Sequence, residues 1–504
     1  MDHVAVDLGA SGGTVYAGQF AKDAIEVAEV YRFDNHPVER NGRYVWDVTR
    51  LIDGIVEGIA KANRIRNRNG EASGNENEDG VIDTVGIDTW GLDFGLVHDG
   101  ELLQPPYSYR DPPFRAAREA ITDRVSRRGV FAATGINHWN TPNTLWQYYH
   151  LATEEADRLN RADRLLMMPQ LLSWLLGGRP AGEATIASTT QMVDPHTGEW
   201  ADELLDRLDL PRSPLPTIEK PGKRLGAVRD DLDPRIGGSP ELVLPASHDT
   251  AAAVAGLPLT ADDPVFLSTG TWFLLGVELD EPNLSSEAFE IGASNERGVE
   301  GTTRFLTNID GFFLLEECRK VWAGAGESLP YDDLLTAARE TEPFGALVDP
   351  DDETLAIEGE MPDRIRAYCE RTNQSPPRTT GEVVRCVLES LTLTTAIALD
   401  DLLDVAGVRT DRIHVGGGGV RNELFCRMLA GATGRTVHAG PAEVTAIGNL
   451  LTQAVAAGTV ESVENGRRLI ERERPPTTYE PRRRAQWADA KDRMRRLLDE
   501  GTAG

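Results

Sequence analysis

The feature of this sequence that most constrains its fold is a strand, small-residue turn, strand pattern that occurs twice. It runs first over residues 4–20, where two apolar segments flank a turn rich in glycine and serine. It runs again over residues 264–278, around the turn Ser-Thr-Gly-Thr at 268–271. An internal repeat of this kind predicts two related domains. The length of 504 residues agrees, because one hydrophobic core rarely grows that large.

The first half of the chain predicts a strand meander followed by helices. Residues 25–33 alternate apolar and polar side chains, so a third antiparallel strand is expected after the first two. A helix is predicted from Val48, and another strand over 81–88. Residues 67–80 are polar and of low complexity, and they predict a disordered surface insertion. Residues 115–176 are expected to be mainly helical.

The second half predicts strands that alternate with helices. A long helix is expected to end at Gly407, and a strand over 412–415 leads into four glycines at 416–419. A helix, a strand from Thr436 and a further helix follow, a succession typical of an α/β sheet. The fold class is therefore α/β. We predict domains over 1–244 and 245–480, with a charged helix or tail over 481–504.

The charge excludes one class of partner. The formal net charge is −29, from 81 acidic and 52 basic residues, whereas nucleic-acid binding needs a basic stripe. Only six of the basic residues are lysine. An acidic surface with few lysines predicts adaptation to a salty cytoplasm.

Targeting signals and disulfides are not indicated. The N-terminus lacks the basic and apolar regions of a secretory signal, and the most apolar window, 165–176, is too short to span a bilayer. A cytoplasmic protein without membrane attachment is expected.

None of the four cysteines forms a C-x-x-C pair, so no zinc site is predicted. Cys369 and Cys386 could form a disulfide, but free thiols are the favoured interpretation. Monomer and homodimer both remain open.

Two glycine-rich turns are candidate phosphate sites. Residues 9–13 lie where backbone N–H groups can approach an anion, and Asp7 ends the preceding strand, where its carboxylate could hold Mg²⁺. The alternative is a plain hairpin turn. The turn at 268–272 offers hydroxyl donors in the same setting. The glycines at 416–419 are costly in conformational entropy, which favours close approach of a nucleotide.

Polar and aromatic residues mark a candidate site for a sugar. The segment 87–94 brings Trp90, Gly91 and Asp93 together, and an aromatic face beside carboxylates is typical of sugar binding. A buried tryptophan beside solvated acids is the alternative. Asn308 precedes a predicted helix, where it could instead be a simple cap.

The segment Ser-His-Asp-Thr at 247–250 lies at a strand-to-helix turn near the middle of the chain. Asp249 at the start of a helix could cap backbone N–H groups or act as a general base. The residues alone leave both open.

These motifs, in this order, resemble the FGGY carbohydrate kinases, and within them the rhamnulokinases. The resemblance rests on Val-Asp-Leu-Gly-Ala-Ser-Gly-Gly from residue 6, Ile-Asp-Thr-Trp-Gly-Leu-Asp-Phe-Gly from 87, Ala-Ser-His-Asp-Thr-Ala from 246, Ser-Thr-Gly-Thr-Trp from 268 and Val-Gly-Gly-Gly from 415. It implies two ribonuclease-H-like domains, as in actin and hexokinase, with an active-site cleft between them. It also implies ATP and Mg²⁺ as cofactors and a ketose as substrate.

The resemblance assigns roles residue by residue. It implies Asp249 as the catalytic base and Asp7 as the metal ligand. The implied sugar contacts are Trp90, Gly91, Asp93, His248, Thr250 and Asn308. The implied ATP contacts are Ala10, Ser11, Gly12, Gly13, Thr14, Thr271, Glu316, Gly417 and Gly418. At positions 12 and 14 the family more commonly has Ser and Arg, so a direct Arg–phosphate contact is not expected there.

The activity implied is ATP-dependent phosphorylation of L-rhamnulose to L-rhamnulose 1-phosphate. Two alternatives stay open. The substrate could be another ketose, such as L-fuculose or xylulose. The chain could also be a non-catalytic nucleotide-binding protein of the actin fold, although Asp249 between His248 and Thr250 argues against that.

Overall fold

The chain folds into two compact units that interleave along the sequence. The computed structural model describes residues 2–9, 11–21, 23–73, 82–270, 272–326, 329–357 and 359–501. The first unit comprises Met1–Pro258, Glu278–Phe305 and Val444–Arg474, and the second comprises Leu259–Val277, Leu306–Glu443 and Pro475–Gly504. The predicted linear division at residue 244 differs from this arrangement, because two later segments pack into the first unit.

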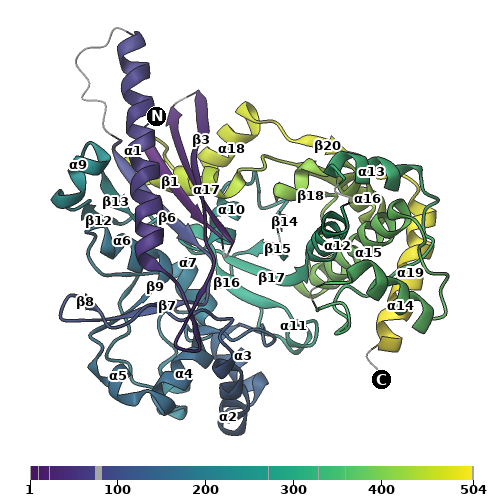
Figure 1. The fold of residues 1–504 in the computed structure, drawn as a ribbon, viewed down its shortest axis with the longest axis horizontal. Helices are drawn as coiled ribbons and strands as arrows, with labels where there is room; N and C mark the ends of the chain where they lie inside the picture. The colour runs from purple at the N-terminus through teal and green to yellow at the C-terminus, as the bar shows by residue number, and fades with distance from the viewer. Residues whose placement is uncertain are drawn as a thin grey trace. The chain divides into compact units, whose positions relative to one another are not determined.

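A mixed six-stranded sheet forms the centre of the first unit (Figure 1). Its order is β12 (Arg224–Ala227), β13 (Glu241–Val243), β6 (Thr84–Thr89), β1 (His3–Leu8), β2 (Gly12–Ala21) and β3 (Ala24–Asp34). β1, β2 and β3 pair antiparallel, which confirms the predicted meander. β6 pairs parallel with β1, and β13 pairs parallel with β6.

Helices cover both faces of this sheet, because alternate side chains of a strand point to opposite faces. Val4, Val6 and Leu8 of β1 face a core shared with α1 (Val48–Ser73) and α6 (Met168–Leu175). Ala5 faces the other way, toward α10 (Asp249–Ala255) and α17 (Val444–Ala457).

Small residues allow α10 and α17 to cross closely. A Cβ atom added at Gly448 would lie 1.8 Å from the carbonyl oxygen of Ala252, and one at Gly256 would lie 2.4 Å from that of Val444. Only glycine fits at such distances. The small residues predicted to follow Asp249 therefore form a helix that packs against a segment almost 200 residues later in the chain, which explains the interleaving.

The region after β6 is mainly helical, as predicted, but it also contributes a strand. Its helices are α2 (Ala117–Arg124), α3 (Arg127–Thr134), α4 (Thr144–Glu154), α5 (Ala156–Arg161), α7 (Ala184–Ala187) and α8 (Asp202–Arg207). β9 (Arg164–Met167) pairs antiparallel with β7 (Phe94–His98), which itself pairs with β8 (Glu101–Leu102). The apolar window at 165–176 is thus a buried strand followed by α6.

The predicted disordered insertion is partly wrong. Its first residues, 67–73, continue α1, because the helix runs without a break from Val48 to Ser73. Residues 74–80 lie outside the described ranges. Polar composition alone was therefore not sufficient to predict disorder over these residues.

A second sheet repeats the plan of the first. Its order is β16 (Ser294–Arg297), β17 (Thr303–Asp310), β15 (Trp272–Leu279), β14 (Val265–Thr269), β18 (Arg412–Gly417), β19 (Thr436–Ala439) and β20 (Thr477–Tyr479). β14 and β15 form an antiparallel hairpin, and β18 and β19 follow in parallel. The same succession, a hairpin and then two parallel strands, occurs in the first sheet, which confirms the predicted repeat.

Helices of the second unit lie together in Figure 1, and their buried side chains form one apolar core. They are α12 (Phe313–Gly324), α13 (Tyr331–Glu340), α14 (Met361–Arg371), α15 (Thr380–Ala406), α16 (Glu423–Thr433) and α19 (Arg484–Gly501). α15 begins with a Thr379–Glu382 capping box and ends at Gly407 in the left-handed conformation, as predicted. Trp487 and Met494 of α19 are buried in this core, so the C-terminal segment includes a packed helix.

Two further expectations concern the cysteines and membranes. All four cysteines are buried and free, which agrees with the favoured interpretation of Cys369 and Cys386. Within the described ranges, none of the helices has the length and apolar character that crossing a membrane requires.

Candidate active site

Carboxylates gather at the carboxyl ends of the parallel strands in the first unit. Asp7 and Asp88 are register partners on β1 and β6. The N–H of Thr89 donates to the carbonyl of Ser247 at 3.0 Å, which brings the segment before Asp249 alongside the end of β6. Ligand sites in open α/β sheets commonly lie at this edge, because the loops that follow the strands converge there.

Burial and mutual repulsion make these carboxylates poor at losing their protons. Burial, and then the charge of Asp249, raise the pKa of Asp7 to about 7. Burial, and then the charge of Asp7, raise the pKa of Asp88 well above its ordinary value. Asn449 of α17 donates to Oδ2 of Asp88 at 2.6 Å, whereas the buried Oδ1 has no hydrogen-bond partner in the described structure. A cation would relieve this repulsion.

Asp249 is the first residue of α10, and its carboxylate is one-third exposed. Oδ1 accepts hydrogen bonds from the backbone N–H of Thr250 at 2.5 Å and from its hydroxyl at 3.1 Å. Nε2 of His248 lies 3.3 Å from the same oxygen. The N-cap residue of α10 is His248 rather than Asp249, but the Asp249 carboxylate does accept the first-turn N–H of Thr250, so it caps one backbone group and keeps an exposed side for chemistry.

A buried glutamate holds the backbone that carries Asp249. Glu183 is fully buried, and its carboxylate accepts hydrogen bonds from the N–H groups of Thr185, Ile186 and Ser247. The Thr185 hydroxyl donates to Glu183 at 2.7 Å and accepts from the N–H of His248 at 3.2 Å. Burial raises the pKa of Glu183, and these donors oppose the rise. Two successive N–H groups of the segment 247–248 are thereby positioned.

Asp93 lies in a buried aromatic cluster. Oδ2 accepts hydrogen bonds from the indole N–H groups of Trp46 at 2.7 Å and Trp90 at 3.0 Å, and Oδ1 accepts one from Gln147 at 2.9 Å. The rings of Trp46 and Trp90 lie 4.3 Å apart. The aromatic residue and the carboxylate of the predicted sugar segment thus contact each other, and Asp93 has no exposed surface. Its direct contact with a sugar stays a prediction.

Gly91 packs closely against the segment 187–191. A Cβ atom at Gly91 would lie 2.9 Å from Oγ1 of Thr189.

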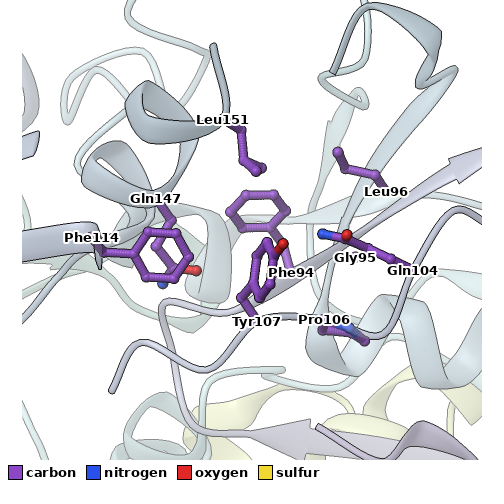
Figure 2. A pocket seen from close by; sticks show the side chains of 9 residues that line it. All are labelled: Phe94, Gly95, Leu96, Gln104, Pro106, Tyr107, Phe114, Gln147 and Leu151. Carbon is purple, nitrogen blue, oxygen red and sulfur yellow. The ribbon is translucent and has the colours of Figure 1, made fainter. Parts of the chain in front are cut away.

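A small cavity beyond β7 does not serve as a sugar site: Figure 2 shows the rings of Phe94, Tyr107 and Phe114 around it, and its volume of 10 Å³ admits about one water molecule. The cavity is lined by Phe94, Gly95, Leu96, Gln104, Pro106, Tyr107, Phe114, Gln147 and Leu151.

The first phosphate-loop candidate is a tight turn between β1 and β2. The N–H of Gly9 donates to the carbonyl of Gly12 at 2.8 Å, and Asn35 donates to the carbonyl of Gly9 at 2.7 Å. Ser11 is exposed, Gly12 half-buried, and Thr14 buried. A Cβ atom at Gly13 would meet Leu8 and Phe33 at 2.6 Å, whereas at Gly12 it would make an ordinary 3.6 Å contact. A side chain at position 13 would therefore force Leu8 and Phe33 to shift, whereas one at position 12 would fit without a clash.

In the second unit, the other two candidate loops meet. Thr269, at the end of β14, donates to the carbonyl of Gly416 at 2.6 Å and accepts from the N–H of Gly419 at 2.9 Å. Gly417 has φ +87°, and a Cβ atom there would lie 2.2 Å from the carbonyl oxygen of Thr269. A Cβ atom at Gly418 would meet open space. The turn therefore requires glycine at position 417, whereas a side chain at position 418 would meet no neighbouring atom.

We expect Gly417→Ala to distort this turn, because an alanine would combine a strained φ with a backbone clash. The free energy of unfolding should fall by about 1–3 kcal/mol, and ATP affinity by about tenfold. Gly434→Ala is the matched control, since its φ of +67° is equally unfavourable but its Cβ meets nothing. Urea unfolding and nucleotide titration measure both. Equal ATP affinity in the two variants would contradict the assignment of the turn.

The remaining predicted residues are placed as follows. Asn308 is exposed and lies within β17, so it is not the cap of the following helix. Glu316 lies in the first turn of α12, and its carboxylate pairs with Arg319 at 2.8 Å. Ala10 and Thr271 lie outside the described residues.

Sequence reasoning missed Glu183 and Asn449, and also Glu296 and Arg304, which lie 3.4 Å and 3.2 Å from Nδ1 of His248. Nothing in the spacing of these four residues connects them with Asp249. The one available signal is a charged residue directly before apolar ones in a strand, as at Arg304 before Phe305 and Leu306, because a buried charge needs a specific partner.

Comparison with known proteins identifies relatives of the whole chain. A family model described as "FGGY family of carbohydrate kinases, N-terminal domain" matches residues 3–256, and its C-terminal counterpart matches residues 265–457. A rhamnulokinase of Bacteroides thetaiotaomicron is 39% identical over 96% of each chain, and one of Oceanobacillus iheyensis is 32% identical over 95% of this chain and 98% of that one. A ligand-bound xylulose kinase of Lactobacillus acidophilus superposes with a TM-score of 0.79 at 15% identity, over 99% of this chain and 98% of that one.

Proposed function

Since the chain belongs to the FGGY family of carbohydrate kinases, we propose that it transfers the γ-phosphoryl group of ATP to the C1 hydroxyl of L-rhamnulose. The substrate follows from the relatives named rhamnulokinase, which align over nearly the whole chain. The observation that carries the chemistry is the Asp249 carboxylate, partly exposed at a helix start and held by His248 and Thr250 beside the buried acids of the first sheet.

Asp249 is the general base of the proposed reaction. Its carboxylate takes the proton of the C1 hydroxyl while that oxygen attacks the γ-phosphorus in line. The bond between the γ-phosphorus and the β,γ-bridging oxygen breaks, ADP leaves, and the proton later passes to water. The products are ADP, L-rhamnulose 1-phosphate and one proton.

The donors near Asp7 fit a magnesium ion. Mg²⁺ prefers carboxylate oxygens and water. Here two buried carboxylates repel each other, and Oδ1 of Asp88 has no hydrogen-bond partner among the described residues. Under this proposal Asp7 holds the ion, and a bound ion supplies neutralisation of phosphate charge. The protein itself contributes backbone N–H groups and excludes water.

ATP is assigned to the glycine-rich turns. The first is the turn between β1 and β2, where Gly12 is not demanded by packing. The others are the loop after β14 and the turn at Gly417 and Gly418, which Thr269 ties together. Close approach of backbone N–H groups to phosphate explains glycine where sterics do not. The full proposed set is Ala10, Ser11, Gly12, Gly13, Thr14, Thr271, Glu316, Gly417 and Gly418.

The sugar is assigned to Trp90, Gly91 and Asp93, which follow β6, and to His248 and Thr250 beside Asp249. Asn308, in the second unit, completes the proposed set on the family resemblance. Of these, Asp93 acts by orienting Trp90.

A panel of L-rhamnulose, L-fuculose and xylulose, assayed with ATP and Mg²⁺ for ADP release, tests the proposal. The highest kcat/KM is expected for L-rhamnulose; a preference for another ketose would reassign the substrate, and ADP release independent of sugar would reject kinase function.

The acidic composition supports adaptation to a salty cytoplasm. With a net charge of −29, screening of repulsion should stabilise the native state. We expect the thermal midpoint to rise by several degrees between about 0.1 M and about 2 M KCl. A midpoint that is unchanged or lower in high salt would contradict this adaptation.

A further inference from the structure

Arg304 is a fully buried cation to which the proposed reaction assigns no role. It lies on β17 with no exposed surface. Its Nε donates to the carbonyl of Arg297 at 3.1 Å, and Nη1 lies 3.0 Å from Oε2 of Glu296. Its Nη2 lies 3.2 Å from Nδ1 of His248. A charge this deeply buried is costly unless its partners are specific, so these three contacts define what it does.

The contact with His248 determines where the imidazole carries its proton. A guanidinium group has donors only, so Nδ1 of His248 must accept from Arg304. The proton of the neutral ring is then on Nε2. Nε2 lies 3.3 Å from Oδ1 of Asp249, so the ring presents an N–H to the carboxylate.

Because Glu296 lies beside the ring, the nitrogen of His248 that carries the proton depends on Arg304. Burial raises the pKa of Glu296, but nearby charge, with Arg304 the largest contributor, outweighs that effect and holds the pKa at about 2. Its Oε2 lies 3.4 Å from Nδ1 of His248. Without the guanidinium, this carboxylate would attract a proton to Nδ1. The neutral ring would then turn a lone pair toward Asp249.

The hydrogen bonds to Asp249 leave one side of its carboxylate for substrate. In the part of the chain that the structure describes, the contacts from His248, from the Thr250 N–H and from the Thr250 hydroxyl all end on Oδ1. A carboxylate oriented through one oxygen presents the other in a defined direction, which general base catalysis requires.

We propose that Arg304 is a positioning residue that holds His248 as the Nε2–H tautomer, so that His248 orients Asp249 through Oδ1 and leaves Oδ2 to the substrate hydroxyl. This inference rests on the proposed function for its kinetic part only. The tautomer of His248 is a property of the protein alone, and it can be measured without a sugar.

The test combines a spectroscopic and a kinetic measurement on the full chain. Histidine-selective ¹⁵N labelling and long-range ¹H–¹⁵N correlation identify the protonated ring nitrogen, with His248→Gln to assign the signals. The wild type should show neutral Nε2–H. Arg304→Met should show Nδ1–H or the doubly protonated ring, with kcat for the preferred ketose lowered on the order of 10- to 100-fold and the KM for ATP little changed. Arg304→Lys should partly restore both.

Arg385→Met is the matched control. It also removes a buried ion pair, with Glu389, but in α15 of the second unit. It should lose stability without changing the His248 tautomer or kcat. A wild-type His248 protonated on Nδ1 would overturn the proposal even if no variant folded, and so would Nε2–H retained in Arg304→Met. If the wild type phosphorylated no ketose, the proposed function would fail, while the tautomer result would still decide the role of Arg304.

Discussion

Asp249→Asn is expected to lower kcat by about 10²- to 10⁴-fold, the range that a positioned general base contributes. Asparagine keeps the size of the side chain and an oxygen that can accept from Thr250, so α10 should form unchanged. What it loses is an acceptor for the substrate proton. Affinities for ATP and sugar should stay within about threefold of wild type, because the change acts on the transition state.

The comparison requires a variant that removes a carboxylate elsewhere. Asp262 is exposed, in the loop before β14, and Asp262→Asn should leave kcat unchanged. Steady-state kinetics with ADP release, together with binding of ATP and sugar by calorimetry, measure both variants. Near-normal turnover by Asp249→Asn would refute the assignment of the base, whatever the substrate.

Asp93→Leu is expected to lower the free energy of unfolding by about 3–6 kcal/mol. Leucine has a similar size but accepts no hydrogen bond, so the N–H groups of Trp46, Trp90 and Gln147 would be left buried without a partner. Each such group costs about 1–3 kcal/mol. Urea unfolding measures the loss. Leu171→Ala in α6, another fully buried site of this unit, gives the cost of lost apolar packing alone. A loss under about 1 kcal/mol in Asp93→Leu would show that the indoles find other partners.

Asp93→Asn separates the charge of this residue from its hydrogen bonds. Burial raises the pKa of Asp93 to about 7, from an ordinary 3.8. The native state therefore binds the proton more tightly than the unfolded chain does, and wild-type stability declines as pH rises between these values. The cost of the buried carboxylate is absent at low pH and complete above about pH 7, where it reaches up to about 4 kcal/mol.

The variant lacks this cost, so its stability relative to wild type should improve as pH rises. Urea unfolding at about pH 5.5 and about pH 8 tests the sign. A relative stability that stays constant over this interval would show that Asp93 does not titrate there.

Local patterns predicted much of the fold. The first three strands, the start of α1 at Val48 and the end of α15 at Gly407 follow from alternation, amphipathicity and a left-handed cap. The parts of the fold that could not be predicted depend on contacts between residues far apart in the sequence. The interleaving of the units arises from the crossing at Gly256 and Gly448, whose partner segments lie far apart in sequence.

The residues of the candidate site also fall into those that could be predicted from local sequence and those that could not. Residues at the ends of strands, such as Asp7 and Gly417, were found because strand-end turns have a recognisable composition. Residues that act through a buried side chain were not, and Glu183 and Arg304 are the clearest cases. Asn308 shows the opposite error, since a polar residue before a predicted helix was compatible with a cap but belongs to a strand.

The central claim is that this chain phosphorylates L-rhamnulose on C1 with Asp249 as the base. NMR of the reaction with [1-¹³C]-L-rhamnulose, ATP and Mg²⁺ tests it most directly, because a C1–O–P linkage splits the labelled carbon signal through its coupling to ³¹P. The wild type should convert the label to a phosphorus-coupled signal as ADP accumulates, and Asp249→Asn should leave the label unchanged over the same period. ADP and inorganic phosphate without a coupled carbon, or equal conversion by the variant, would contradict the account.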